Sequence, residues 1–251
     1  MASSWLPAIP AESDTPLYLV CLPHAGGGAA MYHKWRSIIP SRITVLPVRF
    51  PGRENRLSDA PNSSLKDCVS AIGQEIAEMP GAQIAIFGHS MGALIGYELS
   101  RTLTRDFHQP PVLLIAAGCR APHLEIRQPR IHSMPDDELI NALNSRYSGL
   151  SLNVLQEPEL LKLMLPAIRA DMTLVETYQW HCDESLDVPI LAIGGTNDGQ
   201  VPLVDLAAWR KHTTSDFTQR LFPGGHFFIE TARESVVKTV VRRLDSLISK
   251  A

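Results

Sequence analysis

The sequence predicts an α/β protein with a mostly parallel central sheet and helices on both faces. Short runs rich in Ile, Val and Leu recur along the chain without clean alternation, as in strands that are covered on both faces. Segments with apolar residues at helical spacing lie between these runs, which is typical of crossover helices. The length of 251 residues fits one large α/β domain.

Composition and charge exclude several classes of function. The chain carries 23 Lys and Arg against 26 Asp and Glu, a net charge of -3, so it lacks the basic surface of a nucleic-acid binder. No apolar run approaches the ~18 residues of a membrane span, and the N-terminal residues lack the features of a secretion signal. We therefore expect a cytoplasmic protein that does not bind membranes or nucleic acid.

The cysteines give no sign of a disulfide framework or a zinc site. The 4 cysteines are widely spaced and none forms a CxxC pair. Because a buried free thiol behaves as a small apolar group, we expect all of them to be reduced and structural.

Six apolar runs are predicted to be buried strands, and helical patterns separate several of them. The strands are residues 17–22, 43–48, 83–87, 112–117, 189–193 and 217–222. Helices are predicted from Leu65 to Met79, with Ser64 as N-cap and Pro80-Gly81 at the end, from Ala93 to Leu103, and from Val237 to Ile248.

One connection is too long for an ordinary crossover. About seventy residues separate the strand that ends near Gly118 from the one that begins at Pro189. They contain helical patterns at 136–145 and 158–180, and Pro166 should kink or interrupt the second helix. Such a pair could thicken one edge of the sheet, or could form a lid whose apolar face lines a substrate channel. We predict a single domain over residues 1–251 with a helical lid insertion at approximately 120–182.

The segment Gly88-His89-Ser90-Met91-Gly92 has the pattern of a nucleophile elbow. It follows the predicted strand at 83–87 and opens a helix, and such an elbow is a tight strand-to-helix turn that leaves room only for glycine on either side. Ser90 is therefore the candidate nucleophile. The alternative is a glycine-rich turn with an incidental serine.

A serine nucleophile needs a base, and His226 is the best placed histidine. It lies in Pro223-Gly224-Gly225-His226-Phe227, beyond the last predicted strand, where a loop can project it over the sheet. His212 competes, but it falls on a predicted surface helix with Trp209 and Lys211. His89 is too close to Ser90 along the chain to act as its base.

Asp198 is the candidate for the acid that orients the histidine. It follows the predicted strand at 189–193, and catalytic groups of open parallel sheets collect at the carboxyl ends of strands. Asp205 and Asp187 are less well placed, within a helix and before the strand. The order Ser, Asp, His along the chain is the order of the α/β-hydrolases, so we predict that fold with Ser90, Asp198 and His226 as a catalytic triad.

Two backbone N–H groups should form an oxyanion hole. One donor is Met91, which follows the nucleophile. The second should come from Pro23-His24-Ala25-Gly26-Gly27-Gly28, the loop after the first strand, and we assign it to Ala25. This loop does not end in a phosphate-binding GK[ST] and carries no dinucleotide fingerprint.

With these residues in place, the sequence resembles the type II thioesterases, the stand-alone editing hydrolases of nonribosomal peptide and polyketide synthesis, over nearly its whole length. The likeness rests on Cys21-Leu22-Pro23-His24-Ala25-Gly26-Gly27, Phe50-Pro51-Gly52-Arg53, Gly88-His89-Ser90-Met91-Gly92, Arg120-Ala121-Pro122-His123, Gly194-Gly195 with Asp198, and Gly225-His226-Phe227. The Pro-His-Ala-Gly and Pro-Gly-Arg segments separate this family from generic esterases better than the elbow does. One departure is Asn197, where many relatives carry a second acid.

The resemblance implies the same triad and oxyanion hole, with Ser90, Asp198, His226, Ala25 and Met91 in these roles. It also implies acyl thioesters on the phosphopantetheine arm of a carrier protein as substrates, and a mobile lid from about residue 120 to 180. We thus expect an editing thioesterase of antibiotic or siderophore biosynthesis that needs no metal or other cofactor, acts as a monomer and has acyl or peptidyl carrier domains as partners. The alternatives are a carboxylesterase for small free esters, an acyltransferase of the same fold, or a catalytically idle receptor or scaffold.

Two arginines have open roles at this point. Arg53 and Arg120 could contact a phosphate or a carrier protein, or could tie a loop to the sheet through backbone carbonyls. We favour the second interpretation and leave both arginines out of the predicted site.

Overall fold

A parallel six-stranded sheet forms the centre of the computed structural model, which describes residues 5–8, 17–79, 81–147, 158–181 and 184–248. The strand order is β2-β1-β3-β4-β5-β6, and every strand pair in the sheet is parallel. The strands are β1 (Leu17–Leu22), β2 (Ile43–Pro47), β3 (Gln83–His89), β4 (Leu113–Ala117), β5 (Ile190–Gly195) and β6 (Phe217–Phe222). The predicted fold class is confirmed.

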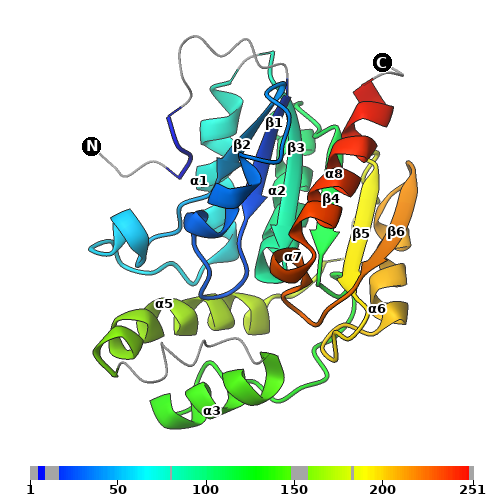
Figure 1. The fold of residues 1–251 in the computed structure, drawn as a ribbon. Coiled ribbons are helices and arrows are strands. Elements are labelled where there is room, and N and C mark those ends of the chain that lie inside the picture. The colour runs from blue at the N-terminus through cyan, green and yellow to red at the C-terminus, as the bar shows by residue number, and fades with distance from the viewer. Residues whose placement is uncertain (1–4, 9–16, 80, 148–157, 182–183, 249–251) are drawn as a thin grey trace.

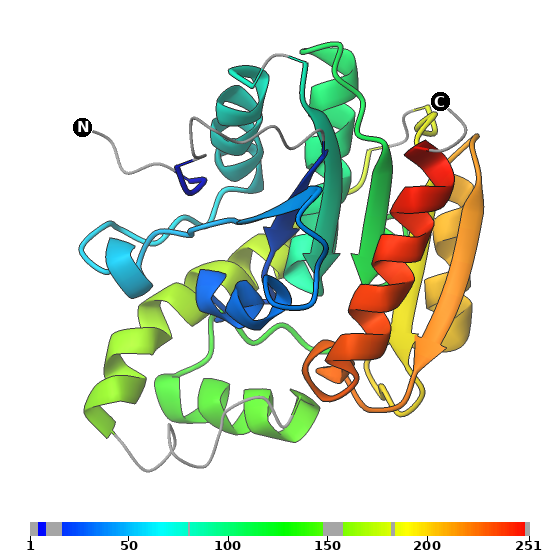
Figure 2. The same cartoon turned by 45° about the horizontal axis from the view of Figure 1, so that its top comes forward.

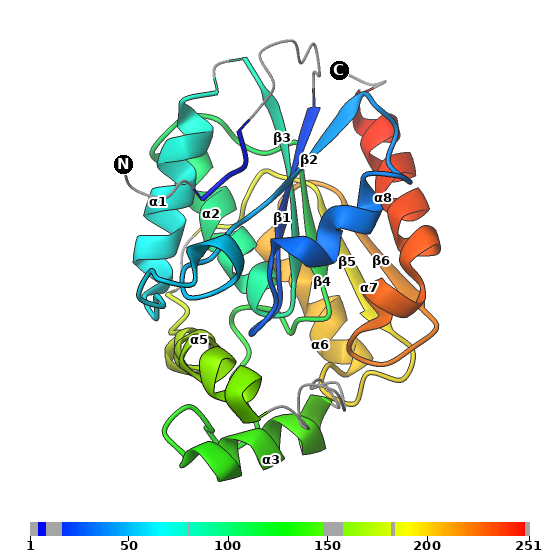
Figure 3. The same cartoon turned by 60° about the vertical axis from the view of Figure 1, so that its left-hand side comes forward.

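Helices cover both faces of this sheet (Figure 3). On one face lie α1 (Leu65–Ala77) and α2 (Met91–Arg105), together with α6 (Leu203–Ala207) and the short 3-10 helix η3 (Ala208–His212). On the other lie the 3-10 helix η1 (Ala29–Trp35), α7 (Phe228–Thr231) and α8 (Arg233–Ile248). A further 3-10 helix, η2 (Glu54–Arg56), follows β2. The hydroxyl of Ser64 accepts a hydrogen bond from the Asp67 N–H at 3.2 Å, so the predicted N-cap of α1 is confirmed.

Two apolar cores result, one on each face, because successive side chains of a strand point to opposite sides. In β1, Val20 and Leu22 pack toward α1 and α2, whereas Leu19 and Cys21 pack toward η1 and α8. All four side chains are fully buried. This double coverage is why the strands read as continuous apolar runs in the sequence.

In its described residues, the long connection between β4 and β5 forms the helices α3 (Asp136–Tyr147) and α5 (Pro158–Thr177), which we call the insertion together with the segments that join them to the sheet. Both helices lie at the end of the sheet toward which the strand arrows point (Figures 1 and 2). They share a small apolar core of their own, which includes Leu139, Leu143, Leu165, Ile168 and Met172. The residues between them and Cys182, like Pro80 at the end of α1, lie outside the described residues.

Pro166 was predicted to kink or interrupt the second helix, and the predicted interruption is wrong. α5 runs unbroken from Pro158 to Thr177 with Pro166 inside it. Leu165, Ala167 and Ile168 beside the proline are all buried. The packing of this stretch outweighs the backbone hydrogen bond that a proline removes.

A cluster of rings joins both ends of the insertion to the body of the protein. His123, soon after β4, hydrogen-bonds through Nδ1 to His212 Nε2 at 2.7 Å, and His212 Nδ1 lies 3.0 Å from the Tyr97 hydroxyl of α2. Trp180, after α5, packs against His212 with ring centroids 5.8 Å apart. The expected surface position of His212 is therefore wrong: His212 and Trp209 are buried because η3 packs against α2.

Candidate active site

The segment between β3 and α2 has the geometry of a strained turn. Ser90 adopts φ 54° and ψ -112°, a conformation that costs a non-glycine residue energy and is common at functional sites. A Cβ atom on Gly88 would lie 2.1 Å from the Gly92 carbonyl oxygen, and one on Gly92 would lie 2.2 Å from the Leu22 carbonyl oxygen. Only glycine fits at these two positions, and the turn projects Ser90 beyond the end of β3.

The structure brings the side chains of Ser90, His226 and Asp198 into one chain of hydrogen bonds. His226 Nε2 lies 3.1 Å from Ser90 Oγ, and His226 Nδ1 lies 2.9 Å from Asp198 Oδ2. Asp198 follows β5 and His226 follows β6, so neighbouring strand ends deliver both residues to the same edge of the sheet. Because a carboxylate only accepts, Nδ1 carries the proton and Nε2 is left to accept the proton of the serine hydroxyl.

Both partners of the serine are buried and held in place. The side chains of His226 and Asp198 are 6% and 1% exposed. Asp198 Oδ1 also accepts the backbone N–H of Gln200 at 2.9 Å, which fixes the plane of the carboxylate. This arrangement can activate a serine hydroxyl for attack on an acyl group.

His89 fixes the backbone of the segment that contains His226. Its Nε2 donates to the His226 carbonyl oxygen at 2.8 Å, and the two rings lie 5.3 Å apart. Complete burial lowers the pKa of His89 well below its usual value, so the ring is neutral at pH 7. This role leaves no local pattern in the sequence, because only the fold brings residues 89 and 226 together.

The two predicted oxyanion donors lie near Ser90, since Met91 follows it in the chain and Ala25 lines a cavity together with it. Met91 is the first residue of α2, where a backbone N–H has no intrahelical acceptor. In the loop after β1, Gly26 N–H donates to Asp171 at 2.7 Å and Gly27 N–H donates to the His24 carbonyl at 2.9 Å, so these groups are occupied. The N–H of Ala25 has no acceptor among the described residues.

His24 holds the other end of the same peptide group. Its Nδ1 lies 2.9 Å from the Ala25 carbonyl oxygen. Burial lowers the pKa of His24 to about 4, so the ring is neutral at pH 7, and Nδ1 must carry the proton because a carbonyl only accepts.

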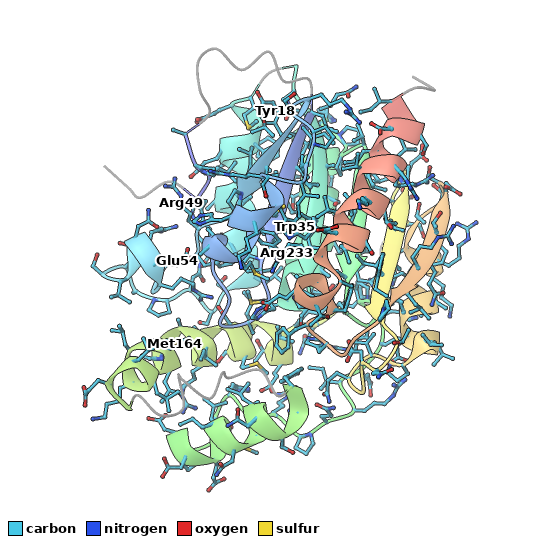
Figure 4. All side chains as sticks on the ribbon, viewed as in Figure 1. Tyr18, Trp35, Arg49, Glu54, Met164 and Arg233 are labelled. Atoms are coloured by element: carbon cyan, nitrogen blue, oxygen red, sulfur yellow. The ribbon has the colours of Figure 1, made fainter. Side chains whose placement is uncertain are left out.

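Two cavities meet at Ser90 and His226. The smaller, of about 100 Å³, is the apolar cavity. Helices α3 and α5 supply half of its lining residues, among them Met164 of α5, which Figure 4 labels. The larger, of about 210 Å³, is the polar cavity. Its charged lining residues are Arg120, Glu125, Arg127, Arg146, Glu176 and Asp205.

Several residues of the insertion line the site, although they were not predicted from the sequence as site residues. Tyr147, the last residue of α3, packs its ring 5.0 Å from that of His226 and lines both cavities. Met172 and Val175 of α5 also line both cavities. The spacing of apolar residues in the insertion indicated helices. It could not show which side chains of these helices contact His226.

The two arginines with open roles both bind backbone carbonyls. Arg53 Nη1 donates to the Gly27 carbonyl at 2.9 Å and Arg120 Nε donates to the Leu124 carbonyl at 2.9 Å. Arg53 also forms a buried ion pair with Asp171 of α5, which the sequence did not predict.

Further features of the described residues concern free thiols, metal-binding clusters and membrane-spanning helices. Cys21, Cys68 and Cys119 are buried free thiols. Within the described ranges, no three His, Cys, Asp or Glu side chains are grouped so that they could hold a metal ion. No helix in the same ranges has the length and apolar character to cross a membrane.

Comparison with known proteins identifies the family. The model of the thioesterase domain family matches residues 18–244. The gramicidin S biosynthesis protein GrsT of Aneurinibacillus migulanus is 35% identical over 242 residues, which are 96% of this chain and 94% of that protein. Among solved structures, ClbQ from the colibactin NRPS/PKS pathway has a TM-score of 0.88 at 32% identity, with 94% of this chain and 99% of that one covered.

A second structure, the type II thioesterase BorB from the borrelidin biosynthetic cluster, has a TM-score of 0.85 at 29% identity and covers 98% of both chains. Sequence, fold and site geometry therefore agree: this chain belongs to the thioesterase family and is an enzyme of the α/β-hydrolase fold, related to the type II thioesterases of NRPS/PKS pathways.

Proposed function

We propose that this enzyme hydrolyses acyl thioesters through an acyl-Ser90 intermediate. His226 takes the proton of the Ser90 hydroxyl, and the serine oxygen attacks the thioester carbonyl carbon. Asp198 holds the imidazole in the Nδ1–H tautomer and stabilises its protonated form. His226 then protonates the departing thiolate, and later activates the water that releases the acid. The N–H groups of Ala25 and Met91 stabilise the oxyanion of each tetrahedral intermediate.

The observation that carries this proposal is the hydrogen-bonded series Asp198–His226–Ser90 at the junction of two cavities. Every chemical step uses a side chain or backbone group of the chain, so the mechanism requires no cofactor.

The two cavities support an assignment of the two halves of the substrate. The apolar cavity would receive the acyl group, and its volume of about 100 Å³ favours a short chain. The polar cavity would receive the phosphopantetheine arm, whose amides and hydroxyl need polar partners. The lining of the polar cavity contains three arginines and three carboxylates, so the cavity has no excess positive charge that would favour a strongly negative ligand.

The partner in this proposal is an acyl or peptidyl carrier domain of a synthase, and the reaction removes aberrant or stalled acyl groups from it. Two similar proteins support this proposal: the type II thioesterase BorB from the borrelidin biosynthetic cluster, and the type II thioesterase YbtT from the yersiniabactin NRPS/PKS pathway. We further propose that the enzyme acts as a monomer in the cytoplasm, where such carriers would meet it.

The experiment compares kcat/KM for one short acyl group carried on a holo carrier protein and on free pantetheine, with Ser90→Ala beside the wild type. We expect a strong preference for the carrier-bound thioester and loss of both activities in the variant. An organophosphonate should label Ser90 in the wild type only.

Three results would contradict the proposal in different ways. An unchanged rate with Ser90→Ala would overturn the mechanism. Equal kcat/KM values for the carrier-bound and the pantetheine thioester, or faster cleavage of simple oxygen esters, would reject the assignment of a carrier-bound substrate. The enzyme would then be a carboxylesterase. Transfer of the acyl group to an added nucleophile in preference to water would indicate an acyltransferase.

A further inference from the structure

A buried carboxylate of the insertion contacts the loop that supplies the proposed oxyanion donor. Asp171, on α5, is 1% exposed. Its Oδ1 and Oδ2 bind Arg53 Nη2 and Nη1 at 2.8 and 2.7 Å, and Oδ2 also accepts the N–H of Gly26 at 2.7 Å. A buried charge is costly unless it is paired and hydrogen-bonded, so these contacts bind α5 firmly to the loop.

Arg53 extends this contact to a second point of the loop. The same Nη1 that binds Asp171 also donates to the Gly27 carbonyl at 2.9 Å. Its neighbour Glu54, labelled in Figure 4, accepts the N–H groups of Ala29 and Ala30 at 2.9 and 2.8 Å. The Pro-Gly-Arg-Glu segment therefore holds the loop after β1 at several backbone atoms.

These bonds determine where the Ala25 N–H points. The peptide group after Ala25 is held at its N–H by Asp171 and at its carbonyl by His24. The peptide group before Ala25 is held at the His24 carbonyl by the Gly27 N–H. Because peptide groups are planar, fixing both of them fixes the direction of the N–H between them.

A close approach between α5 and the loop supports the same conclusion independently. Gly26 has φ +77°, and a Cβ atom there would lie 3.0 Å from Ile168 Cγ1. Ile168 is three residues before Asp171, on the same face of α5. The helix thus both packs against the loop and hydrogen-bonds to it.

We propose that Asp171 and Arg53 are positioning residues that make the oxyanion hole depend on the seating of α5. With α5 in place, the Gly26 N–H and the Arg53 guanidinium have their acceptor and the Ala25 N–H is aimed at the reacting carbonyl. With α5 displaced, both groups lose that acceptor and the loop loses its constraint. The inference deepens the proposed function and rests on its oxyanion hole.

The test uses Asp171→Ala, Asp171→Asn and the double substitution of Asp171→Leu with Arg53→Met. Loss of one oxyanion donor lowers kcat by about 10²-fold or more, so we expect a fall of this order in kcat with little change in KM for Asp171→Ala. Asp171→Asn should lie between this variant and the wild type, because its amide oxygen can still accept the Gly26 N–H. The double variant replaces the ion pair by apolar groups, which preserves folding if Asp171→Ala does not fold.

Two inhibitors separate positioning from a general loss of structure. An acyl trifluoromethyl ketone adds the Ser90 oxygen to its carbonyl carbon, with the hydroxyl proton passing to His226 and the carbonyl electron pair to the oxyanion. Its inhibition constant should rise in each variant by about the factor by which kcat/KM falls. The matched thioether, which has a methylene in place of the carbonyl, should bind equally well to all of them.

Glu75→Gln is the matched control. Glu75, on α1, is also a carboxylate that accepts two backbone N–H groups, those of Trp5 and Leu6 at 2.7 and 2.9 Å, but it lines neither cavity. We expect lower stability with unchanged kcat and unchanged trifluoromethyl ketone inhibition.

The coupling is overturned if the folded double variant keeps the wild-type kcat, or if ketone and thioether weaken equally. The Ser90→Ala experiment decides the proposed function separately. An essential Ser90 together with a fully active Asp171→Ala would reject only the coupling.

Discussion

Mild acid should destabilise this protein through the buried His212. Burial, and then the positive charges of His123, Arg101 and Lys211, lower the pKa of His212 from 6.5 to about 4. In the unfolded chain the imidazole takes up its proton near 6.5. Between the two values the unfolded state binds more protons than the folded state, so stability is present above about pH 6.5 and is lost as the pH falls toward about 4.

The size of the effect follows from the two pKa values. A lowering from 6.5 to about 4 corresponds to about 3.4 kcal/mol once both states are protonated, of which about 2 kcal/mol is lost by about pH 5. The loss should be concentrated where His123 and Trp180 join the insertion to α2 and η3. Neutral His212 accepts a hydrogen bond at one ring nitrogen and donates at the other, so its protonation breaks the bond that it accepts.

Urea unfolding at about pH 7.5 and about pH 5 measures this loss, with His212→Asn as the variant that cannot titrate. The wild type should lose about 2 kcal/mol more than the variant between the two conditions. His33→Asn is the control, since His33 is exposed on η1 and should lose as much as the wild type. If wild type and His212→Asn lost stability equally, the assignment of a depressed pKa to this histidine would be refuted.

Two further predictions concern the elbow and its surroundings. Gly88→Ala should yield a protein that is destabilised and inactive, because the new Cβ would lie 2.1 Å from the Gly92 carbonyl; thermal melting and thioester hydrolysis measure this, and a stable, active variant would contradict the tight-turn geometry. His89→Ala removes the donor to the His226 carbonyl and should cost about 1–3 kcal/mol of stability and lower kcat more than it raises KM. Wild-type kcat in that variant would show that the bond is not needed to position His226 for the proposed reaction.

Strands β1, β4 and β5 could be predicted from the sequence because each is buried on both faces and stands out as an apolar run, whereas β6, at the edge of the sheet, is mostly half-buried or exposed. The expected bounds of β1 and β6 match the structure to the residue. β5 extends further than expected, through Gly194 and Gly195, which pair with Leu221 and Phe222 of β6. Gly195 is required there because a Cβ atom would lie 2.3 Å from the Gly225 carbonyl, a contact that involves a distant segment and leaves no local pattern.

The same distinction applies to the site. The grouping of Ser90, Asp198 and His226 could be predicted because each follows a recognisable strand, and the ends of parallel strands converge. Asp171 was not, since its contact with Gly26 spans 145 residues of sequence. The burial of His212 could not be predicted for a similar reason. A short helix of mixed polarity is typical of the protein surface, and the rings of Tyr97 and Trp180 that cover His212 come from distant segments.

The Arg53–Asp171 ion pair also limits how the insertion can be exchanged between related enzymes. The insertion has its own small core and resembles a module that could be grafted to alter the acyl groups accepted. An imported insertion without an acid at this position would leave Arg53 buried without its partner, at a cost of about 3–5 kcal/mol. Substrate range and the Pro-Gly-Arg-Glu segment should therefore be inherited together, and a designed chimera has to transplant both.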